Sequence, residues 1–344
     1  MKFSRIRCLL LCLGLCTVVR AQTGGRHAYA FLDLVPAPRV AAMGGVLNAL
    51  ADGDVTLVAY NPAALNAAMH RTAALSYVDY IAGIRYGYAT LGWHAERLGT
   101  FAGGVQYVDY GSFTEADENG IITGSFSAAE YALQLSYGRS VEVRRGTLQA
   151  GMTLKPVWSQ MDDYHSFGVV ADLGLMYSTE DGGWNFAAVV RNAGTQIKTY
   201  AGRYETMPID VQLGAVRQFR HAPVRVSVVL QHLEDMHLRE EREFYNEDTG
   251  MMEKESKSGW KQAGEEAWRH VVCGLEFFPF EGFWLRAGYN PLRRDELAVD
   301  GKKSTVGFSW GAGLNIRSLT FAYASARYHL AGAVNLWSLQ VHFK

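Results

Sequence analysis

The chain has 344 residues, of which 49% are hydrophobic, and its formal net charge is -1. A nearly neutral chain without a basic block gives no support to a nucleic-acid partner. The sequence contains no His-Glu-x-x-His, Cys-x-x-Cys or Gly-x-Ser-x-Gly motif and no glycine loop that would cradle a phosphate. We therefore expect neither an enzyme nor a bound cofactor or metal.

Residues 1–21 have the pattern of a secretory signal peptide. Basic residues at positions 2, 5 and 7 precede the apolar stretch 9–19, which is too short to span a bilayer as a helix. Ala21 is a small residue at the usual cleavage position, so we expect cleavage before Gln22. A buried N-terminal helix is the alternative. An exported chain would keep Cys273 as its single cysteine, which excludes an internal disulfide.

Residues 22–70 lack strand periodicity and predict short helices and turns. A helix is expected to end at a Gly-Gly pair, Asp-Gly-Asp is typical of a turn, and Asn-Pro opens another turn or helix. A large barrel encloses more space than its own side chains fill, so this segment is predicted to enter the lumen as a plug or hatch. A periplasmic cap with solvated charges is the alternative. The candidate plug residues are Arg39, Gly44, Gly45, Asp52, Asp54, Asn61 and Pro62, with Arg39 expected to pair with Asp52 or Asp54.

From residue 71 to residue 344, large apolar residues alternate with small or polar ones. In the range 131–138, for example, every large apolar residue is followed by Ala, Gln, Ser or Gly. Successive side chains of a strand point to opposite faces, so this period predicts strands with one apolar face. Fourteen such segments are expected: 72–80, 84–93, 98–110, 130–138, 147–158, 166–177, 183–192, 209–219, 223–233, 267–278, 283–290, 304–316, 318–327 and 334–343.

The connections between these segments fall into two length classes. Those after even-numbered segments are brief, whereas most of those after odd-numbered segments are long: 111–129, 193–208, 234–266 and 291–303. Bacterial outer-membrane barrels have an even number of strands, short periplasmic turns and longer extracellular loops. The fold class predicted is therefore all-β, a transmembrane barrel of about 14 antiparallel strands surrounded by outer-membrane lipid, in the envelope of a Gram-negative cell.

Aromatic residues lie near the ends of several segments. An interfacial girdle is expected from Trp93, Trp158, Trp184, Trp268, Trp284 and Trp337. The last segment is amphipathic and has an aromatic residue one position before the end of the chain. Barrel-assembly machinery reads last strands of this kind, so an assembly signal is expected from Trp337, Leu339, Val341 and Phe343.

The segment 234–266 is strongly acidic and is predicted to be an extracellular loop. Anionic lipopolysaccharide would repel it, so it favours a protein partner, although a solvated loop without a partner is the alternative. The candidate docking residues are Glu240, Glu241, Glu243, Glu247 and Asp248. Just before them, the sequence 232–237 contains two histidines and two acids that could bind a metal, but we interpret it as a solvated loop.

Several stretches resemble a known family. Residues 31–32, 38–45, 52–54 and 61–63 (Phe-Leu, Pro-Arg-Val-Ala-Ala-Met-Gly-Gly, Asp-Gly-Asp and Asn-Pro-Ala) are similar to the N-terminal signature of the PorV/PorQ proteins. These are outer-membrane components of the type IX secretion system of Bacteroidetes and distant relatives of FadL-type fatty-acid channels. The stretches that resemble PorQ specifically are 77–84, 106–111, 153–156 and 191–196. The likeness covers most of the mature chain except 234–303, and the family pattern would place a serine near Ala37 and Pro38.

The resemblance implies a non-enzymatic barrel in a surface attachment complex that anchors cargo to lipopolysaccharide. Its implied partner is a surface protein resembling PorZ, together with PorU and PorV. The alternative function is a FadL-like channel for hydrophobic small molecules, with residues 22–70 as the hatch. Such a channel needs a kinked strand, for which Gly103-Gly104 is the candidate, although glycines are also common in bulges. A structural porin is the third hypothesis.

Overall fold

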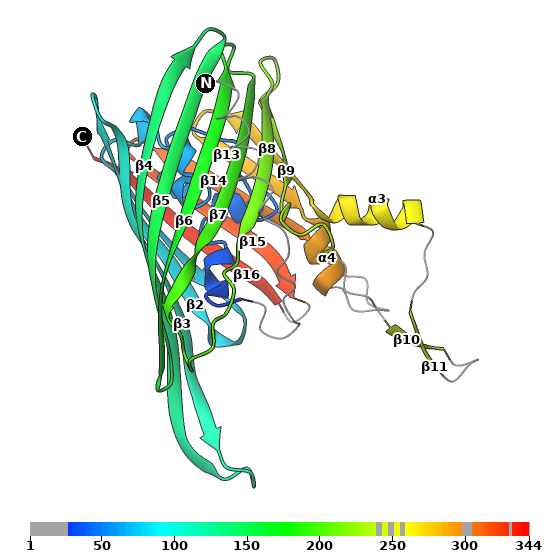
Figure 1. Ribbon diagram of the computed structural model, residues 1–344. Helices are drawn as coiled ribbons and strands as arrows, with labels where there is room; N and C mark the ends of the chain where they lie inside the picture. The colour runs from blue at the N-terminus through cyan, green and yellow to red at the C-terminus, as the bar shows by residue number, and fades with distance from the viewer. Residues whose placement is uncertain are drawn as a thin grey trace, which may run out of the picture.

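The computed structural model describes residues 27–238, 243–246, 251–254, 259–297, 305–329 and 332–343. The predicted signal peptide lies outside these residues. The described chain forms a closed antiparallel barrel in which every strand pairs with its neighbour in chain order and β1 pairs with β16 (Figure 1). Its fourteen strands are β1 Thr72–Asp79, β2 Arg85–Ala95, β3 Gly99–Ala116, β4 Ile122–Val143, β5 Gly146–Met161, β6 Tyr164–Thr179, β7 Trp184–Lys198, β8 Asp210–Gln218, β9 Val224–Leu230, β12 Val271–Phe280, β13 Phe283–Tyr289, β14 Phe308–Ile316, β15 Leu319–His329 and β16 Gly332–His342.

Each predicted segment overlaps one of these strands, so the fourteen-strand barrel expected from the sequence is confirmed. The expected loop 111–129 is wrong, because β3 and β4 continue through it as a paired hairpin. The stacked rings of Phe113 and Phe126, 5.1 Å apart, extend this hairpin beyond the segment that the period-two pattern predicted. In Figure 1 the hairpin projects downward past the other strands.

The predicted strand segment 267–278 begins as a helix. Residues Gly259–Arg269 form helix α3, and β12 begins only at Val271. The helix contains Lys, Gln, Ala and Glu and no β-branched residue, a composition that favours helix over strand. A second helix, α4 (Pro291–Leu297), follows β13, and a two-stranded hairpin, β10 (Glu243–Asn246) with β11 (Met251–Lys254), precedes α3. Helix α3 and this hairpin stand away from the barrel wall in Figure 1.

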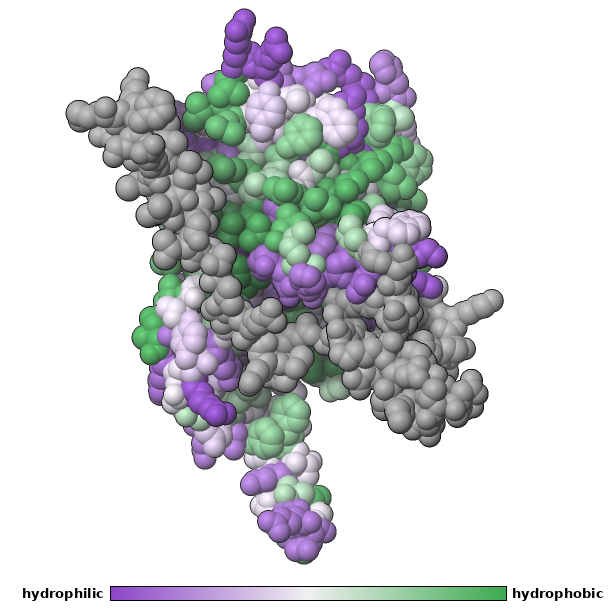
Figure 2. Space-filling model, turned by 45° about the vertical axis from the view of Figure 1, so that its right-hand side comes forward, coloured by the Kyte–Doolittle hydropathy of each residue, from purple (hydrophilic) through white to green (hydrophobic). Residues whose placement is uncertain are grey.

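The outer face of the wall is apolar. Along β1, Leu75 and Tyr77 are exposed, whereas Ala74, Ser76 and Val78 are buried, as the alternation predicts. Figure 2 shows a hydrophobic band on the wall with hydrophilic residues above it. Within the part of the chain that the structure describes, no helix is both long and apolar enough to cross a bilayer.

Most of the expected aromatic girdle lies on this outer face, with two exceptions. Trp93, Trp158, Trp184 and Trp337 have exposed rings on strands, at 40 to 49% of full accessibility. Trp268 lies in α3 rather than in a strand. Trp284 shares the inward face with Arg286, whose guanidinium covers its ring at 5.0 Å, because the two residues are two positions apart on β13.

The two rims of the barrel differ. The rim with the brief connections at 96–98, 144–145, 180–183, 219–223, 281–282 and 317–318 is called the turn end. The opposite rim, called the loop end, carries the connections 199–209 and 231–238, the β3–β4 hairpin and helices α3 and α4. The connection at Asp162-Asp163 also belongs to the loop end and is a two-residue turn in which Asp162 has φ 55°.

Residues 27–70, called the lumen segment, lie inside the barrel rather than as a cap outside it (Figure 1). Nearly all residues from Val35 to Leu65 are buried, and they form one core with inward side chains of the wall such as Tyr88 and Val157. The segment contains no strand and is built of short helices: η1 Ala30–Asp33, α2 Pro38–Ala42, η2 Val55–Ala59, η3 Pro62–Ala64 and η4 Ala67–Met69.

The ends of helix α2 follow from its sequence. Ala37 precedes it in an extended conformation without a side-chain cap, where the family pattern would place a serine. Pro38 takes over as the first helical residue, because its ring fixes φ and it has no amide hydrogen to leave unpaired. Gly44 and Gly45 end the helix with φ of 94° and 91°, as the Gly-Gly pair predicted.

Candidate functional site in the barrel lumen

Arg39 joins the lumen segment to the barrel wall near the turn end. Its guanidinium donates to both carboxylate oxygens of Glu276 on β12, at 3.0 and 3.2 Å. The same group lies 2.8 Å from Asp52 and 3.3 Å from Asp54. The structure thus brings together the Arg39, Asp52 and Asp54 of the sequence analysis and adds a wall carboxylate that the sequence had not singled out.

Glu276 is fully buried and accepts hydrogen bonds from two further arginines. Arg286 Nε lies 2.6 Å from Glu276 Oε1, and Arg225 Nη1 lies 2.7 Å from Glu276 Oε2. These six residues are called the anchor cluster: Arg39, Asp52, Asp54, Arg225, Glu276 and Arg286. Three cations face three carboxylates around the buried pair Arg39 and Glu276, so the cluster carries no net charge, which offsets part of the cost of desolvating that pair.

Arg39 favours the ionised form of Asp52. Burial opposes ionisation of Asp52, but the adjacent Arg39 guanidinium holds the pKa of that carboxyl below its usual value. A polar cavity of about 240 Å³ adjoins the cluster on the turn-end side. Its lining includes Thr56, Trp284, Asn315, Thr320, Ser338 and Gln340. Gln340 contacts the lumen segment twice, accepting from Val55 N at 3.1 Å and donating to Gly53 O at 2.9 Å.

In the middle of the barrel, the lumen segment lies directly against glycines of the barrel wall. A Cβ on Gly151 would collide with Pro62, one on Gly174 with Asn61, and one on Gly288 with the backbone of Gly44. Asn61 caps η3 by accepting from Ala63 N at 2.8 Å and also donates to Asn48 O. Glycine at these wall positions therefore lets the lumen segment approach without a gap.

A second polar group lies farther toward the loop end, on β5 to β8. Lys155 Nζ is 2.6 Å from Asp172 and 3.0 Å from Asn192 Oδ1, all three buried. Arg191 donates to Leu32 O in the lumen segment and covers the ring of Tyr60 at 5.4 Å. Asn192 has φ 55° and sits at a register shift between β6 and β7, so a bulge turns these side chains inward.

A larger cavity, about 450 Å³, lies at the loop end beneath the start of the lumen segment. Small-molecule sites typically have volumes of about 300–1,000 Å³ and mainly apolar walls. This cavity, called the rim cavity, is lined by His27, Ala28, Tyr29, Ala30, Tyr110, Glu130, Met161, Tyr164, Tyr200, Ala201 and Glu205. Aromatic, alanine and methionine side chains supply most of the lining, so an apolar molecule would be surrounded by carbon on several sides.

The rim cavity contains one buried carboxyl group with spare acceptor capacity. Glu130 is 2% exposed, and its Oε2 accepts from Tyr110 OH at 2.6 Å. Glu130 Oε1 accepts no hydrogen bond of ordinary geometry from the described residues. A buried acceptor without a donor is costly, so this atom would favour a ligand that offers a hydroxyl or amino hydrogen.

The lumen segment forms one edge of the rim cavity through neutral contacts. Tyr29 OH lies 2.6 Å from Ser166 Oγ, and Ala28 N donates to Thr206 O at 2.9 Å. Phe31 O accepts from Gln106 Nε2 at 2.9 Å. None of these three contacts involves a formal charge, which sets this edge apart from the anchor cluster.

The other predicted site residues are more dispersed. Glu240, Glu241, Glu247 and Asp248 lie outside the described residues, and Glu243 is the first residue of β10, so their docking role stays a prediction. Trp337, Leu339 and Val341 lie on β16, where Trp337 contacts Tyr77 and Tyr323, and Phe343 follows the strand. Their role in assembly likewise stays a prediction.

The strand irregularity expected at Gly103-Gly104 is not there. Gly103 pairs with Leu91 and Leu135, and Gly104 with Thr90 and Gln134, without a break. The register of β3 and β4 shifts instead between Asp109 and Ser112, next to the rim cavity, where Gly111 has φ 78°. Gly111 needs the positive φ that glycine adopts easily, whereas Gly103 and Gly104 do not.

Comparisons with known proteins bear on the fold. No protein-family model matches the sequence, and no curated protein sequence matches it. Among solved structures, the toluene transporter TbuX of Ralstonia pickettii matches at TM-score 0.54 with 14% identity, over 89% of this chain and 98% of TbuX. A deletion mutant of the monoaromatic hydrocarbon channel TodX, a Pseudomonas putida protein, matches at 0.52 with 15% identity, over 92% of this chain and 100% of TodX.

A FadL homologue from Pseudomonas aeruginosa is also similar, at TM-score 0.47 and 11% identity, over 89% of this chain and 98% of the homologue. At such identities a likeness establishes the fold and nothing finer. This chain therefore has the barrel fold that TbuX and TodX share. The finer resemblance to PorV/PorQ proteins stays a prediction.

Proposed function

We propose that this protein is an outer-membrane channel for small apolar molecules, with the lumen segment as its hatch. The observation that carries the proposal is the rim cavity of about 450 Å³, which is mainly apolar and has the first residues of the lumen segment as one wall. The fold is shared with barrels described as a toluene transporter and a monoaromatic hydrocarbon channel, which agrees with that use.

The position of the cavity fits an entry site. If the short turns face the periplasm, as in bacterial barrels generally, the loop end and its cavity face the outside. A buried core then separates the rim cavity from the polar cavity at the turn end. Passage consequently requires the lumen segment to move, and its neutral contacts at the loop end are the ones that break at the lower energetic cost.

The rim cavity also suggests a ligand class. Tyr29, Tyr110, Tyr164 and Tyr200 provide aromatic surface, and Glu130 Oε1 provides one acceptor. An aromatic molecule with a single hydroxyl hydrogen satisfies both features, whereas a charged solute would lose its hydration without gaining matching partners.

Two fluorescent probes, naphthalene and 1-naphthol, test this proposal on the purified full chain in detergent. Both are expected to bind, and Ala201→Trp, which fills the cavity, is expected to abolish binding. The matched control is Ala116→Trp on the exposed β3–β4 hairpin, which leaves the cavity open. Glu130→Met is expected to weaken 1-naphthol roughly tenfold more than naphthalene, because it removes the oxygen that would accept the hydroxyl hydrogen.

Uptake by Gram-negative cells that produce the protein completes the test. Cells with the unaltered chain or with Ala116→Trp are expected to take up naphthalene faster than cells without the protein. Cells with Ala201→Trp are expected to take it up no faster than cells without the protein. Binding without faster uptake would leave the cavity as a binding site but would overturn the channel.

A scaffold in a type IX attachment complex is the second candidate function. It is favoured by the parts that project from the loop end, namely the β10–β11 hairpin, which lies within the acidic segment 234–266, and helix α3, which begins there (Figure 1). Trp260 of α3 is 76% exposed, with Lys261 over its ring at 5.9 Å. Affinity purification from solubilised outer membranes, comparing the intact chain with one lacking 240–260, tests it. A stoichiometric surface protein that is lost with the deletion would support the scaffold.

A further inference from the structure

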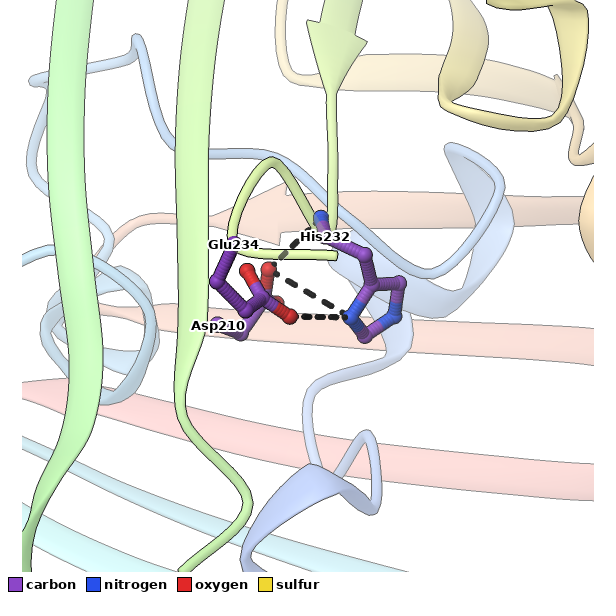
Figure 3. A group of neighbouring side chains, drawn as sticks. All are labelled: Asp210, His232 and Glu234. Carbon is purple, nitrogen blue, oxygen red and sulfur yellow. Dashed lines mark hydrogen bonds and ion pairs between the residues drawn. The ribbon is translucent and has the colours of Figure 1, made fainter. Parts of the chain in front are cut away.

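Three potential metal ligands converge at the loop end, outside the rim cavity. Asp210 is the first residue of β8, and His232 and Glu234 belong to the connection that follows β9. One ligand atom from each residue lies within 4.8 Å of the others. In Figure 3 the two carboxylates and the imidazole point toward a common centre. His232 Nδ1 is 3.2 Å from Glu234 Oε1 and 3.7 Å from Asp210 Oδ1.

The backbone holds these side chains in place before any ion arrives. His232 N donates to Asp210 Oδ1 at 2.9 Å, and Val211 N donates to Glu234 Oε2 at 2.7 Å. Leu233 N donates to Val211 O at 3.0 Å, which closes the turn onto β8. His232 adopts φ 54°, a conformation that is uncommon for a residue with a Cβ. His232 Nδ1 faces Glu234 Oε1 and Asp210 Oδ1, so one imidazole nitrogen and two carboxylate oxygens point toward the same space.

The charges around the three residues leave room for a cation. Asp210 and Glu234 are continuous with the buried group formed by Asp172, Asp33, Lys155 and Arg191. Four carboxyl side chains there stand beside only two basic ones, Lys155 and Arg191, and this acidic excess favours a cation at the three ligands.

We infer that Asp210, His232 and Glu234 form a binding site for a divalent transition-metal ion, with Zn²⁺ as the preferred occupant. One imidazole nitrogen with two carboxylate oxygens suits Zn²⁺ better than Ca²⁺, which takes six to eight oxygen ligands. Three protein ligands leave further positions for water. The ion would cross-link the start of the β9–β12 connection to β8. This point lies next to the connection 199–209, which lines part of the rim cavity.

Isothermal titration of the metal-stripped full chain with ZnCl₂ tests the inference, with the protein purified through a tag that contains no histidine. The variants Asp210→Asn and Glu234→Gln keep an acceptor for the backbone amides of His232 and Val211 but lose a charge. His232→Asn removes the imidazole with a residue that tolerates positive φ. The control is His237→Ala, which removes a nearby exposed histidine outside the cluster.

One Zn²⁺ per chain is expected, with affinity reduced at least thirtyfold in each of the three variants and unchanged in His237→Ala. Zn²⁺ is also expected to raise the thermal midpoint of the unaltered chain and of His237→Ala but not of His232→Asn. No saturable binding to the unaltered chain, or equally tight binding by a chain that carries all three substitutions together, would overturn the site. Tighter binding of Ca²⁺ than of Zn²⁺ would overturn the assigned ion class.

Discussion

The lumen segment is held in different ways at its two ends. At the turn end, Arg39 is locked between wall and segment carboxylates in a buried, charge-balanced cluster. At the loop end, Tyr29 and Ala28 make neutral hydrogen bonds beside an apolar cavity. Breaking a buried ion pair costs far more than breaking a neutral hydrogen bond. We infer that residues 27–31 are the first part of the lumen segment to leave the wall, because Leu32 already accepts from Arg191 and Arg39 lies among carboxylates.

The largest effect is expected from Arg39→Ala, which removes the charged contact at the turn end. It leaves Asp52 and Asp54 without their central partner and is expected to destabilise the barrel by about 3–5 kcal/mol, as for other broken buried pairs. The midpoint of urea unfolding, followed by tryptophan fluorescence, measures the change. Arg85→Ala, at an exposed arginine at the start of β2, is the control and is expected to shift the midpoint little. Equal shifts for the two variants would show that the anchor cluster contributes nothing.

Gly288→Ala tests the contact between wall and lumen segment in the middle of the barrel. Its Cβ would meet the backbone of Met43 and Gly44, which cannot move aside as a side chain can. Overpacking of this kind typically costs about 1–3 kcal/mol. Gly103→Ala is the matched control, because a Cβ there meets nothing within 4 Å. The same urea midpoint measures both, and a larger loss in Gly103→Ala would contradict the packing described.

Tyr29→Phe tests the loop-end contact. It removes one neutral hydrogen bond to Ser166, which keeps Lys198 O as a second partner, so the expected cost is only about 0.5–1.5 kcal/mol. Hydrogen exchange followed by mass spectrometry should show faster exchange of the amides of residues 28–35 with no change at 40–60. Faster exchange in both ranges would mean that the two ends are coupled.

The smallest effect is expected from pH. The pKa of Asp52 lies below its ordinary value, so its ion pair stabilises the fold fully above pH 4 and is lost only as the pH falls through the lowered pKa. Exchange at residues 52–56 should therefore be constant between pH 5 and pH 7 after correction for intrinsic rates. It should rise below pH 4 in the unaltered chain but less in Asp52→Asn, which has no charge to lose.

The sequence by itself determined much of the architecture. The period of two fixed the number of strands and the face that each side chain takes, because a barrel wall separates lipid from lumen at every second residue. The lack of that period in residues 27–70, with Gly-Gly and Asn-Pro at the right places, set apart the lumen segment and its helix end. Local chemistry predicted that Arg39 pairs with Asp52 or Asp54, and the structure shows it beside both.

Only the tertiary structure decided the contacts between distant segments. Glu276 lies 237 positions from Arg39, and alternation shows that it faces inward but not which cation it meets. The same holds for Glu130, whose neighbours in the rim cavity come from several parts of the chain. Asp210 meets His232 because β8 and β9 pair, and that pairing register was not evident from the sequence. The β3–β4 hairpin and helix α3 likewise departed from the periodic pattern, because outside the lipid layer no bilayer imposes alternation on the chain.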